Sequence, residues 1–513
     1  MFTRFLLTGE RSRGSIYSEP PLSFSRLYTE RRFHVCLLAA ISLLVLFTRL
    51  HQGDLSGYDD AVYAHEGKQM LATGQWWSVY LNGQLDFDKP PLFVWLEAAS
   101  MWLFGVTDFA ARFPAALLGF GTILLVFFIA RELTTSYWLP VWAMMILLCT
   151  QVFLRFAMRA MTDVPFTFFF ALALFFYLKA LKQPRYFLGC GLAISCAVLT
   201  RSFLGLIPLI IMLAHLPLSG RLSLLRAKHF LLGLLLSVGL PLIWFVSQYR
   251  LHGGEFLALH FSFTVDNLPL TNGKQPTQFS GGLLQYPRFL LASYWPWLPL
   301  LLLGLLAQCK KLLRERDAAS GLLLLWVVCV IGPFSLAEFK WLRYILPVFP
   351  AFAILAALPL DQWLTDQRRK LFLKVAYGVL CLTLTGMAAN PKYRFRPEEL
   401  RRLAPIAEAA TPPDQRILLY TERPPRDAHL FQVIWYANRF CEPIATVEGV
   451  LNHLAAEPNT AVIMDKRVFS DICNAIPNVK LLGETEGFVC WIPSREADTA
   501  QAPAQTTANP ELN

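Results

Sequence analysis

The chain has 513 residues, of which 55% are hydrophobic and 16% charged, and its formal net charge is +10. A soluble globular protein has about 25% charged residues, so the composition excludes a wholly soluble protein and indicates that much of the chain faces lipid. The basic residues lie mainly in short loops between apolar segments, which favours a membrane topology over a nucleic-acid-binding role.

The predicted elements begin with a basic tail, residues 1–32, followed by a membrane domain over residues 33–389. A transmembrane helix needs about 20 mainly apolar residues, and by this criterion the chain has about eleven spans. They are predicted near 33–50, 113–130, 137–154, 164–181, 186–200, 203–218, 230–248, 288–307, 321–337, 344–360 and 371–389. The tail and alternate loops carry most of the Lys and Arg residues. The positive-inside rule therefore places the N-terminus in the cytoplasm and the C-terminal part outside.

The first outer loop, residues 51–112, is long, and loops of this length are uncommon unless they are functional. A helix is predicted from Asp59 to Leu71, with Gly74 as its stop signal. The apolar stretch 92–104 is too short to span the membrane and too apolar for water. It is therefore predicted to be a helix that lies along the membrane surface.

The adjacent acids Asp59 and Asp60 lie just beyond the first span, where they can work on a lipid-linked substrate at the bilayer surface. One of these carboxylates can act as a general base or hold a head group at the mouth of a cavity. The alternative is that an Asp at a helix start caps the helix by accepting backbone N–H bonds. Two adjacent acids exceed what capping needs, so one residue can do each job.

Two further pairs of polar residues in this loop are candidate binding groups. His65-Glu66 lacks the second histidine of a zinc helix, because Gln69 stands one turn on, so zinc is disfavoured there. In the pair Asp88-Lys89, the lysine can neutralise a phosphate and the aspartate can bind a divalent metal or a sugar hydroxyl. The alternative for this pair is a solvated turn before Pro90.

Several charges lie at the outer edges of later spans, where a buried charge costs about 2.5–3.5 kcal/mol. Such groups are more favourable in a polar cavity than in lipid, although snorkelling to the interface is the alternative for each one. These residues are Arg155, Arg159, Asp163, Arg201, Lys340 and Arg343. The second long outer loop, from Tyr249 to about Arg288, adds four polar residues whose spacing favours none of them. They are Glu255, His260, Asp266 and Asn267.

After about residue 390 the composition becomes that of a soluble domain, predicted over 390–496, and a disordered tail is predicted over 497–513. Strands and helices alternate there, which predicts a small α/β domain. The predicted strands are 416–420, 461–464, 479–482 and 488–492, and the predicted helices are 429–438, 447–456 and 468–476. One disulfide among Cys441, Cys473 and Cys490 can form if this part is exported, but their odd number argues against a disulfide framework.

The ordered motifs of the membrane part resemble those of one family. The motifs are Tyr58-Asp59-Asp60-Ala61-Val62-Tyr63-Ala64, Gly74-Gln75-Trp76, Phe87-Asp88-Lys89-Pro90-Pro91, Arg159-Ala160 with Asp163, Leu199-Thr200-Arg201, and Lys340 with Tyr344-Ile345-Leu346-Pro347. The chain is similar to the integral-membrane glycosyltransferases of the GT-C type, which include the bacterial lipid A aminoarabinose transferases and, more distantly, the protein O-mannosyltransferases. The sequence departs from the lipid A enzymes at Asp60 and Val62, which replace a Glu and a basic residue, and at Asp88, which replaces a Glu.

The resemblance implies a site and a donor. Asp59 and Asp60 become the catalytic acids, and the donor is a sugar linked to a polyprenyl phosphate. Residues implied to bind the donor phosphate or sugar are Tyr63, Asp88, Lys89, Arg159, Asp163, Arg201, Lys340 and Tyr344. Asp88 is also the candidate ligand if a divalent metal takes part. The implied location is the bacterial inner membrane, with the C-terminal domain in the periplasm.

The function expected from these features is sugar transfer by single displacement, with inversion at the anomeric carbon. The acceptor lies on the outer face and is lipid A or lipopolysaccharide, another lipid, or a protein. A transporter or lipid flippase is the alternative, but no internal repeat of the transporter kind is found in the sequence. A membrane receptor is disfavoured because the acids lie in the membrane-proximal loop.

Overall fold

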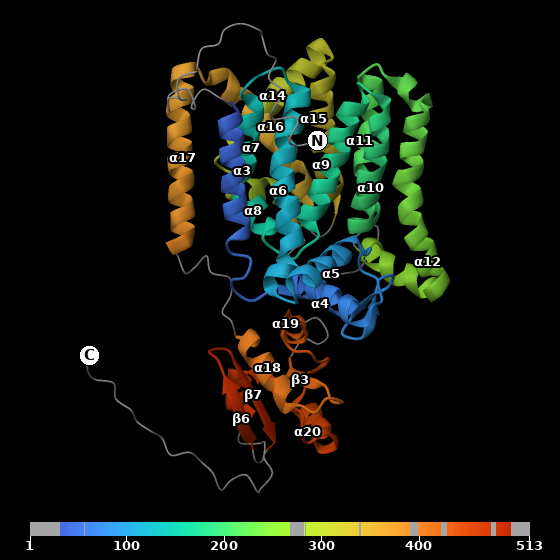
Figure 1. The fold of residues 1–513 in the computed structure, drawn as a ribbon, viewed down its shortest axis with the longest axis vertical. Helices are drawn as coiled ribbons and strands as arrows, with labels where there is room; N and C mark the ends of the chain where they lie inside the picture. Colours follow the sequence, from blue (N-terminus) through green and yellow to red (C-terminus); the bar gives the residue numbers. More distant parts are fainter. Residues whose placement is uncertain are drawn as a thin grey trace, which may run out of the picture.

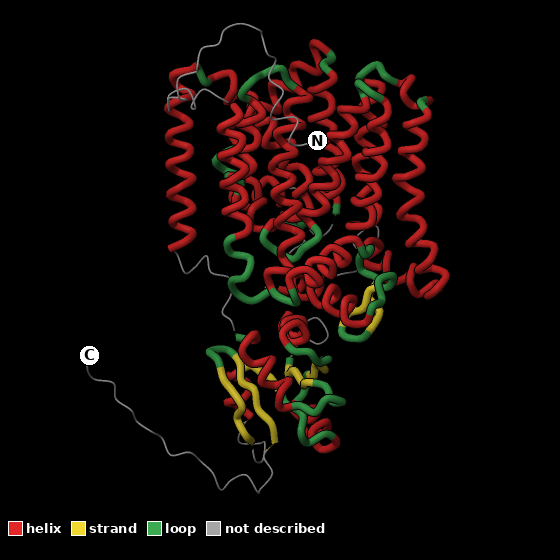
Figure 2. Tube along the Cα trace, in the orientation of Figure 1, coloured by secondary structure: helices red, strands yellow, loops and turns green. Residues whose placement is uncertain are grey.

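The computed structural model describes residues 31–55, 57–266, 282, 284–337, 340–389, 399–421, 428–472 and 479–493. Most of the predicted basic tail, the predicted disordered tail, Asn267 and Cys473 lie outside these ranges. Helices form an upright bundle at one end of the molecule, and strands are confined to a hairpin beside the bundle and a sheet at the other end (Figure 2).

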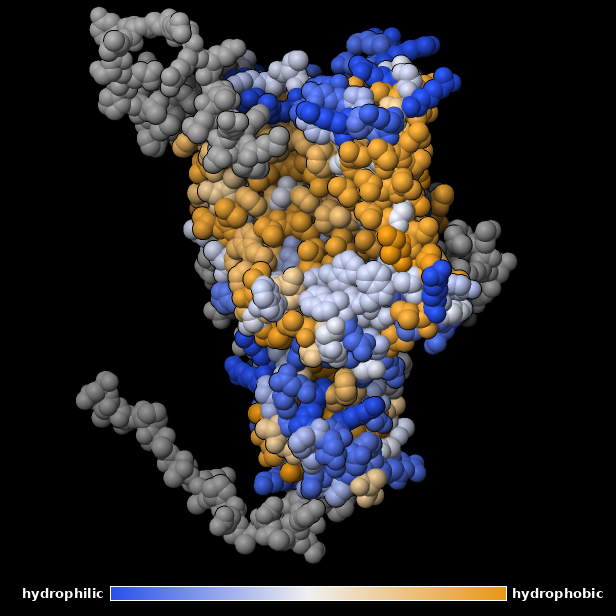
Figure 3. Space-filling view, turned by 45° about the vertical axis from the view of Figure 1, so that its right-hand side comes forward, coloured by the Kyte–Doolittle hydropathy of each residue, from blue (hydrophilic) through white to orange (hydrophobic). Residues whose placement is uncertain are grey.

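The bundle contains the helices predicted as membrane spans. They are α3 (Arg31–Phe47), α6 (Asp108–Leu133), α7 (Leu139–Leu148), α8 (Gln151–Ala157), α9 (Asp163–Ala180), α10 (Phe187–Arg201), α11 (Ile207–Leu218), α12 (Lys228–Asp266), α13 (Gln285–Ser293), α14 (Leu298–Glu315), α15 (Ala318–Leu336), α16 (Phe349–Trp363) and α17 (Asp366–Ala389). On the face seen in Figure 3, an apolar belt covers this bundle between two hydrophilic ends. The chain is therefore a multi-pass α-helical membrane protein.

The predicted number of about eleven spans is not confirmed. Among the described residues, six helices are long and apolar enough to cross a membrane, and the bent pair α7 and α8 makes up to seven. Several predicted spans fall short of the criterion for local reasons. Helix α3 has only 17 residues, and α10 and α11 lie in one helical stretch, Pro184–Leu218.

Helices α10 and α11 nevertheless run in opposite directions. Arg201 at the end of α10 pairs with Asp163 at the start of α9, whereas His215 near the end of α11 lies 2.7 Å from the Tyr177 hydroxyl near the end of α9. The reversal occurs at Ser202, whose φ of 55° is rare for a residue with a side chain.

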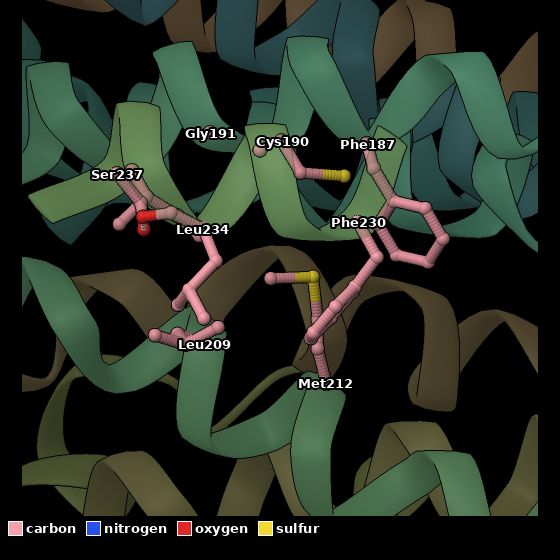
Figure 4. Close-up of a pocket in the computed structure, with 10 residues that line it drawn as sticks. Phe187, Cys190, Gly191, Leu209, Met212, Phe230, Leu234 and Ser237 are labelled. Carbon is pink, nitrogen blue, oxygen red and sulfur yellow. Dashed lines mark hydrogen bonds between the residues drawn. The ribbon is translucent and has the colours of Figure 1, made fainter. Parts of the chain in front are cut away.

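The tight packing of α10 against α12 depends on glycine. A Cβ atom on Gly191 or Gly233 would collide with a backbone carbonyl of the opposite helix. Between α10, α11 and α12 remains a cavity of about 10 Å³, lined by apolar side chains such as Phe187 and Met212 and by Ser237 (Figure 4). No charged residue lines this cavity, so it belongs to the packing and not to the chemistry.

The first outer loop contains two helices that lie across the end of the bundle, α4 (Gly57–Thr73) and α5 (Leu92–Phe104) (Figure 1). Both match the predicted helices. Gly74 and Gly105, with φ of 68° and 78°, follow them, which is the backbone conformation that glycine permits at helix ends. Between the helices lies an unpredicted hairpin of β1 (Val79–Leu81) and β2 (Gln84–Asp86).

Arg112 anchors the start of this loop to α6. Its side chain is fully buried and donates to the backbone carbonyls of Leu50, Gln52, Gly53 and Asp54 at 2.9–3.2 Å. A guanidinium has five donors in a fixed plane, so one side chain can hold several carbonyls at once. The segment that leads from α3 into α4 is thereby set in place.

The C-terminal domain is a five-stranded sheet with helices, which confirms the predicted α/β class. Its elements are α18 (Leu400–Ala410), β3 (Ile417–Tyr420), α19 (Ala428–Tyr436), β4 (Cys441–Ile444), α20 (Val447–Ala456), β5 (Val462–Asp465), α21 (Lys466–Ile472), β6 (Val479–Glu484) and β7 (Phe488–Pro493). The strand order is β4-β3-β5-β7-β6, with β3 parallel to β4 and β5 and with β7 antiparallel to β5 and β6. Strand β4 was not predicted, and Cys441 and Cys490 are free thiols.

Helix α19 docks this domain onto α4 and its flanking residues. Lys68 of α4 donates to the carbonyls of Trp435 and Ala437 at 2.8 and 3.0 Å, and His65 lies 3.1 Å from the Ile434 carbonyl. The Trp435 indole N–H donates to Asp108 at the start of α6 over 2.8 Å. The helix that carries Asp59 is therefore held between the bundle and the C-terminal domain.

The burial of His65 in this contact predicts that the stability of the protein depends on pH. Burial lowers the pKa of His65 from 6.5 to about 4, because the charged ring is disfavoured away from water. The unfolded chain therefore binds the proton more readily than the folded chain does. The contribution of His65 to the free energy of unfolding is complete above pH 6.5 and is lost as the pH drops from 6.5 through about 4. The full loss is about 3 kcal/mol. Thermal unfolding of the wild type between about pH 7 and pH 4 should show this loss.

The variant His65→Gln should lack this part of the pH dependence, while the exposed control His51→Gln should retain it. An unchanged acid transition in His65→Gln would assign the effect to another group.

Candidate active site

The carboxylate of Asp59 is directed toward the membrane bundle. Asp59 lies in the first turn of α4, and its Oδ2 accepts a charged hydrogen bond from Arg343. Arg343 lies in the 3₁₀ turn η4 (Leu342–Val348), just before α16. The side chains of Asp59 and Arg343 are 25% and 21% exposed, so this ion pair is partly buried and partly accessible.

A second ion pair lies beside the first. Asp163, at the start of α9, accepts from Arg201 at the end of α10, and their side chains are only 2% and 11% exposed. The ring of Tyr344 lies 5.5 Å from the Arg201 guanidinium and 5.7 Å from that of Arg343. A single tyrosine therefore contacts both cations and joins the two ion pairs into one cluster.

Tyr63 connects this cluster with the acids of the first loop. It is buried one turn after Asp59, with its ring edge-to-face on Phe93 at 5.7 Å. Burial raises the pKa of Tyr63 well above its usual range, and the negative charges of Asp59 and Asp88 raise it further. The hydroxyl therefore keeps its proton and can donate a hydrogen bond.

Glu66 and Asp86 form a buried carboxyl pair next to Tyr63. Burial raises the pKa of Glu66 well above its usual range, and the hydrogen-bonded Asp86 raises it further. Glu66 therefore keeps its proton and donates a hydrogen bond to Asp86, which also accepts one from the backbone N–H of Asp88 at 2.8 Å. This pair fixes the backbone that leads into Asp88 and Lys89.

His260 joins the Asp88-Lys89 segment to the end of α10. Its Nδ1 lies 2.7 Å from the Phe87 carbonyl oxygen, and its Nε2 lies 3.0 Å from the Ser202 hydroxyl. A carbonyl can only accept, so Nδ1–H donates to it and Nε2 accepts from Ser202. This bridge fixes the position of the Asp88–Lys89 ion pair relative to Arg201. The charged atoms of that pair are 2.8 Å apart.

Other predicted site residues lie elsewhere. Asp60 is 1% exposed and interacts electrostatically with Glu97 of α5 and Arg155 of α8. Arg159 lies 5.9 Å from the Phe156 ring. Lys340 donates to the carbonyl of Ala337 at 2.6 Å, so the cation that pairs with Asp59 is Arg343 and not Lys340.

A metal ligand role for Asp88 remains a prediction. Within the described ranges, no three side chains of His, Cys, Asp or Glu lie together as a metal site requires. The ion pair of Asp88 with Lys89 satisfies one of its oxygens without a metal.

The chain is similar to known proteins in both sequence and fold. Residues 33–257 match the family described as dolichyl-phosphate-mannose-protein mannosyltransferase. An uncharacterised protein of Aquifex aeolicus is 29% identical over 361 residues, 70% of each chain. An undecaprenyl phosphate-alpha-4-amino-4-deoxy-L-arabinose arabinosyl transferase of Sodalis glossinidius is 29% identical over 332 residues, which is 63% of this chain and 58% of that protein.

A solved structure agrees on the fold. The crystal structure of ArnT from Cupriavidus metallidurans bound to undecaprenyl phosphate superimposes with a TM-score of 0.70 over 90% of this chain and 98% of that chain, at 17% identity. The chain therefore has the GT-C-type fold. The sequence and structure matches together identify it as a membrane glycosyltransferase. The transporter or flippase alternative is not favoured by these matches.

The structure adds residues to the site of this glycosyltransferase that the sequence did not single out. Glu66 was considered only as part of a zinc helix, Asp86 lies in no motif, and Ser202 follows the motif residue Arg201. His260 was one of four equivalent candidates in the second long loop.

The protonated state of Glu66 can be tested by substitution. We expect Glu66→Gln to keep thermal stability and turnover near the wild type, because the amide can donate to Asp86 as the carboxyl does. Glu66→Ala removes the donor and should cost about 1–3 kcal/mol. Thermal unfolding and initial rates of sugar transfer measure both effects. Equal losses in the two variants would mean that Glu66 acts as a carboxylate.

Proposed function

We propose that this glycosyltransferase moves a sugar from a polyprenyl-phosphate donor to an acceptor at the outer face of the bacterial inner membrane. The observation that carries the proposal is the cluster of Asp59–Arg343, Asp163–Arg201 and Tyr344 at the junction of the bundle with the outer loop. The named activity of the Sodalis glossinidius relative supports undecaprenyl phosphate as the donor lipid. The preferred acceptor is lipid A or lipopolysaccharide, with another lipid or a protein as the alternatives.

The cations of the cluster suit the donor phosphate. The cations come from separate parts of the chain: Arg201 and Arg343 belong to the cluster, and Lys89 belongs to the first outer loop. Guanidinium groups bind phosphate oxygens with paired hydrogen bonds. Their charge stabilises the negative charge that builds up on the leaving polyprenyl phosphate. In this mechanism the phosphate competes with Asp59 for Arg343, so donor binding loosens the carboxylate from its ion pair.

Asp59 then acts on the acceptor. In the proposed single displacement, the acceptor oxygen forms a bond to the anomeric carbon while the bond from that carbon to the phosphate oxygen breaks. The polyprenyl phosphate leaves with the electron pair, and Asp59 takes the proton of a hydroxyl acceptor. The acceptor attacks from the face opposite the leaving group, so the anomeric configuration inverts.

The accessibility of the two ion pairs supports this division of roles. Asp163 is almost completely buried and holds Arg201, which suits a structural acid. Asp59 is a quarter exposed, so water or an acceptor can reach it. Asp60 is retained as a second catalytic candidate, although its burial favours a supporting role.

Replacement of Asp59 tests the proposal most directly. Asp59→Asn should lower turnover by about 10²–10⁴-fold, because the amide cannot accept the proton. The measurement is transfer of label from a radiolabelled polyprenyl-phosphate sugar to an envelope lipid extract. Asp414→Asn, at an exposed site in the C-terminal domain, is the matched control and should not change the rate. Turnover of Asp59→Asn within a few-fold of the wild type would remove Asp59 from the mechanism.

The phosphate-binding role of the arginines predicts a separate effect. Arg201→Lys and Arg343→Lys should each weaken inhibition by undecaprenyl phosphate about 10- to 100-fold, since lysine cannot reproduce the paired hydrogen bonds. Arg467→Lys on the exposed surface of the C-terminal domain is the control. If both site variants bind the inhibitor as tightly as this control, the donor phosphate lies elsewhere.

A further inference from the structure

A charged cavity lies at the opposite end of the bundle from the active site. Asp108 at the start of α6 bonds to Trp435 of the C-terminal domain, so the last turn of α6, with Arg131 and Glu132, lies at the far end. Lys179, in the last turn of α9, lies next to it, because its ammonium is 2.6 Å from a Glu132 oxygen.

The cavity combines aromatic walls with cations. Its volume is about 160 Å³, and it is lined by Phe128, Arg131, Glu132, Phe175 and Lys179. The rings of Phe128 and Phe175 have centroids 6.2 Å apart, and the Lys179 ammonium lies 5.8 Å from the Phe175 centroid. One water needs about 10–15 Å³ of such space, so the cavity has room for a group larger than a single water.

The charges leave the cavity positive. Glu132 is 13% exposed, and its two oxygens bind Lys179 at 2.6 Å and Lys182 at 2.7 Å. An ammonium has three N–H donors, so each lysine keeps donors for another acceptor. Arg131 and Lys179 line the cavity with Glu132, and Lys182 binds the same carboxylate, so three cations accompany one anion. Glu132 thus holds the two ammonium groups in place without neutralising the set.

We propose that this cavity binds the phosphate of an anionic phospholipid head group, with Phe128 and Phe175 against the apolar part of the lipid. Basic pockets between transmembrane helices are a recurrent way to bind anionic lipid head groups. The location at the end of two apolar helices places the cations at head-group depth. The site is separate from the sugar-transfer cluster and does not depend on the proposed function.

The test uses the full-length protein in detergent and measures binding of phosphatidylglycerol by native mass spectrometry. Each basic residue near a membrane surface contributes about 1 kcal/mol, which is about fivefold in affinity. Arg131→Ala with Lys179→Ala should therefore weaken phosphatidylglycerol binding about 25-fold relative to the wild type. Phosphatidylcholine, which carries no net charge, should bind weakly to both proteins.

Control variants separate this site from general attraction to basic surfaces. Lys310→Ala and Arg314→Ala, both exposed on α14, should leave phosphatidylglycerol binding unchanged. Lys179→Gln alone removes one cation and should weaken binding about fivefold, which tests the site even if the double variant does not fold. Equal binding by the wild type and all variants would overturn the proposal. Binding of inorganic phosphate in place of the lipid, at the same residues, would also overturn it.

Discussion

The ion pair between Asp59 and Arg343 is the interaction on which the site depends. It joins a helix of the first outer loop to a turn of the bundle that is 284 residues away in the chain. A charge at the edge of the hydrocarbon is costly to bury alone, so each of these groups is stable there because the other is present. The pair therefore positions a reactive carboxylate and a phosphate-binding cation by the same contact.

The surroundings hold this pair from both sides. Arg112 sets the segment before α4 through four backbone carbonyls. On the other face, Lys68 and His65 bind the carbonyls of α19. The C-terminal domain thus contributes no catalytic acid of its own to the described cluster, yet it restrains the helix that carries Asp59. Positioning of reactive groups by rigid elements is what a transfer reaction needs most.

Burial divides the acids of the first loop into different chemical states. Glu66 keeps its proton and donates a hydrogen bond to Asp86, whereas Asp59 accepts one from Arg343. A side-chain carboxyl group therefore serves as a hydrogen-bond donor in one place and as an acceptor in another. At the far end of the bundle, Glu132 has a third role, since it holds two lysines beside an aromatic cavity.

Much of this architecture follows from the sequence alone. The length of the apolar segments predicted helices at each span and at α5, and Gly74 predicted the end of α4, because these signals depend on neighbouring residues only. The motifs around Asp59, Lys89 and Arg201 indicated the enzyme class. The hairpin of β1 and β2, strand β4 and the number of crossings escaped prediction, since short strands and helix reversals are set by contacts with distant segments.

Tertiary structure alone decided which charges meet. The sequence placed Lys340 and Arg343 together at one helix start, but only the fold turns Arg343 toward Asp59 and Lys340 toward Ala337. In the same way, the sequence presented His260 without a partner, and the fold sets it between Phe87 and Ser202. Residue type and spacing determine what a side chain can do, whereas its partner depends on how segments far apart in the chain pack around it.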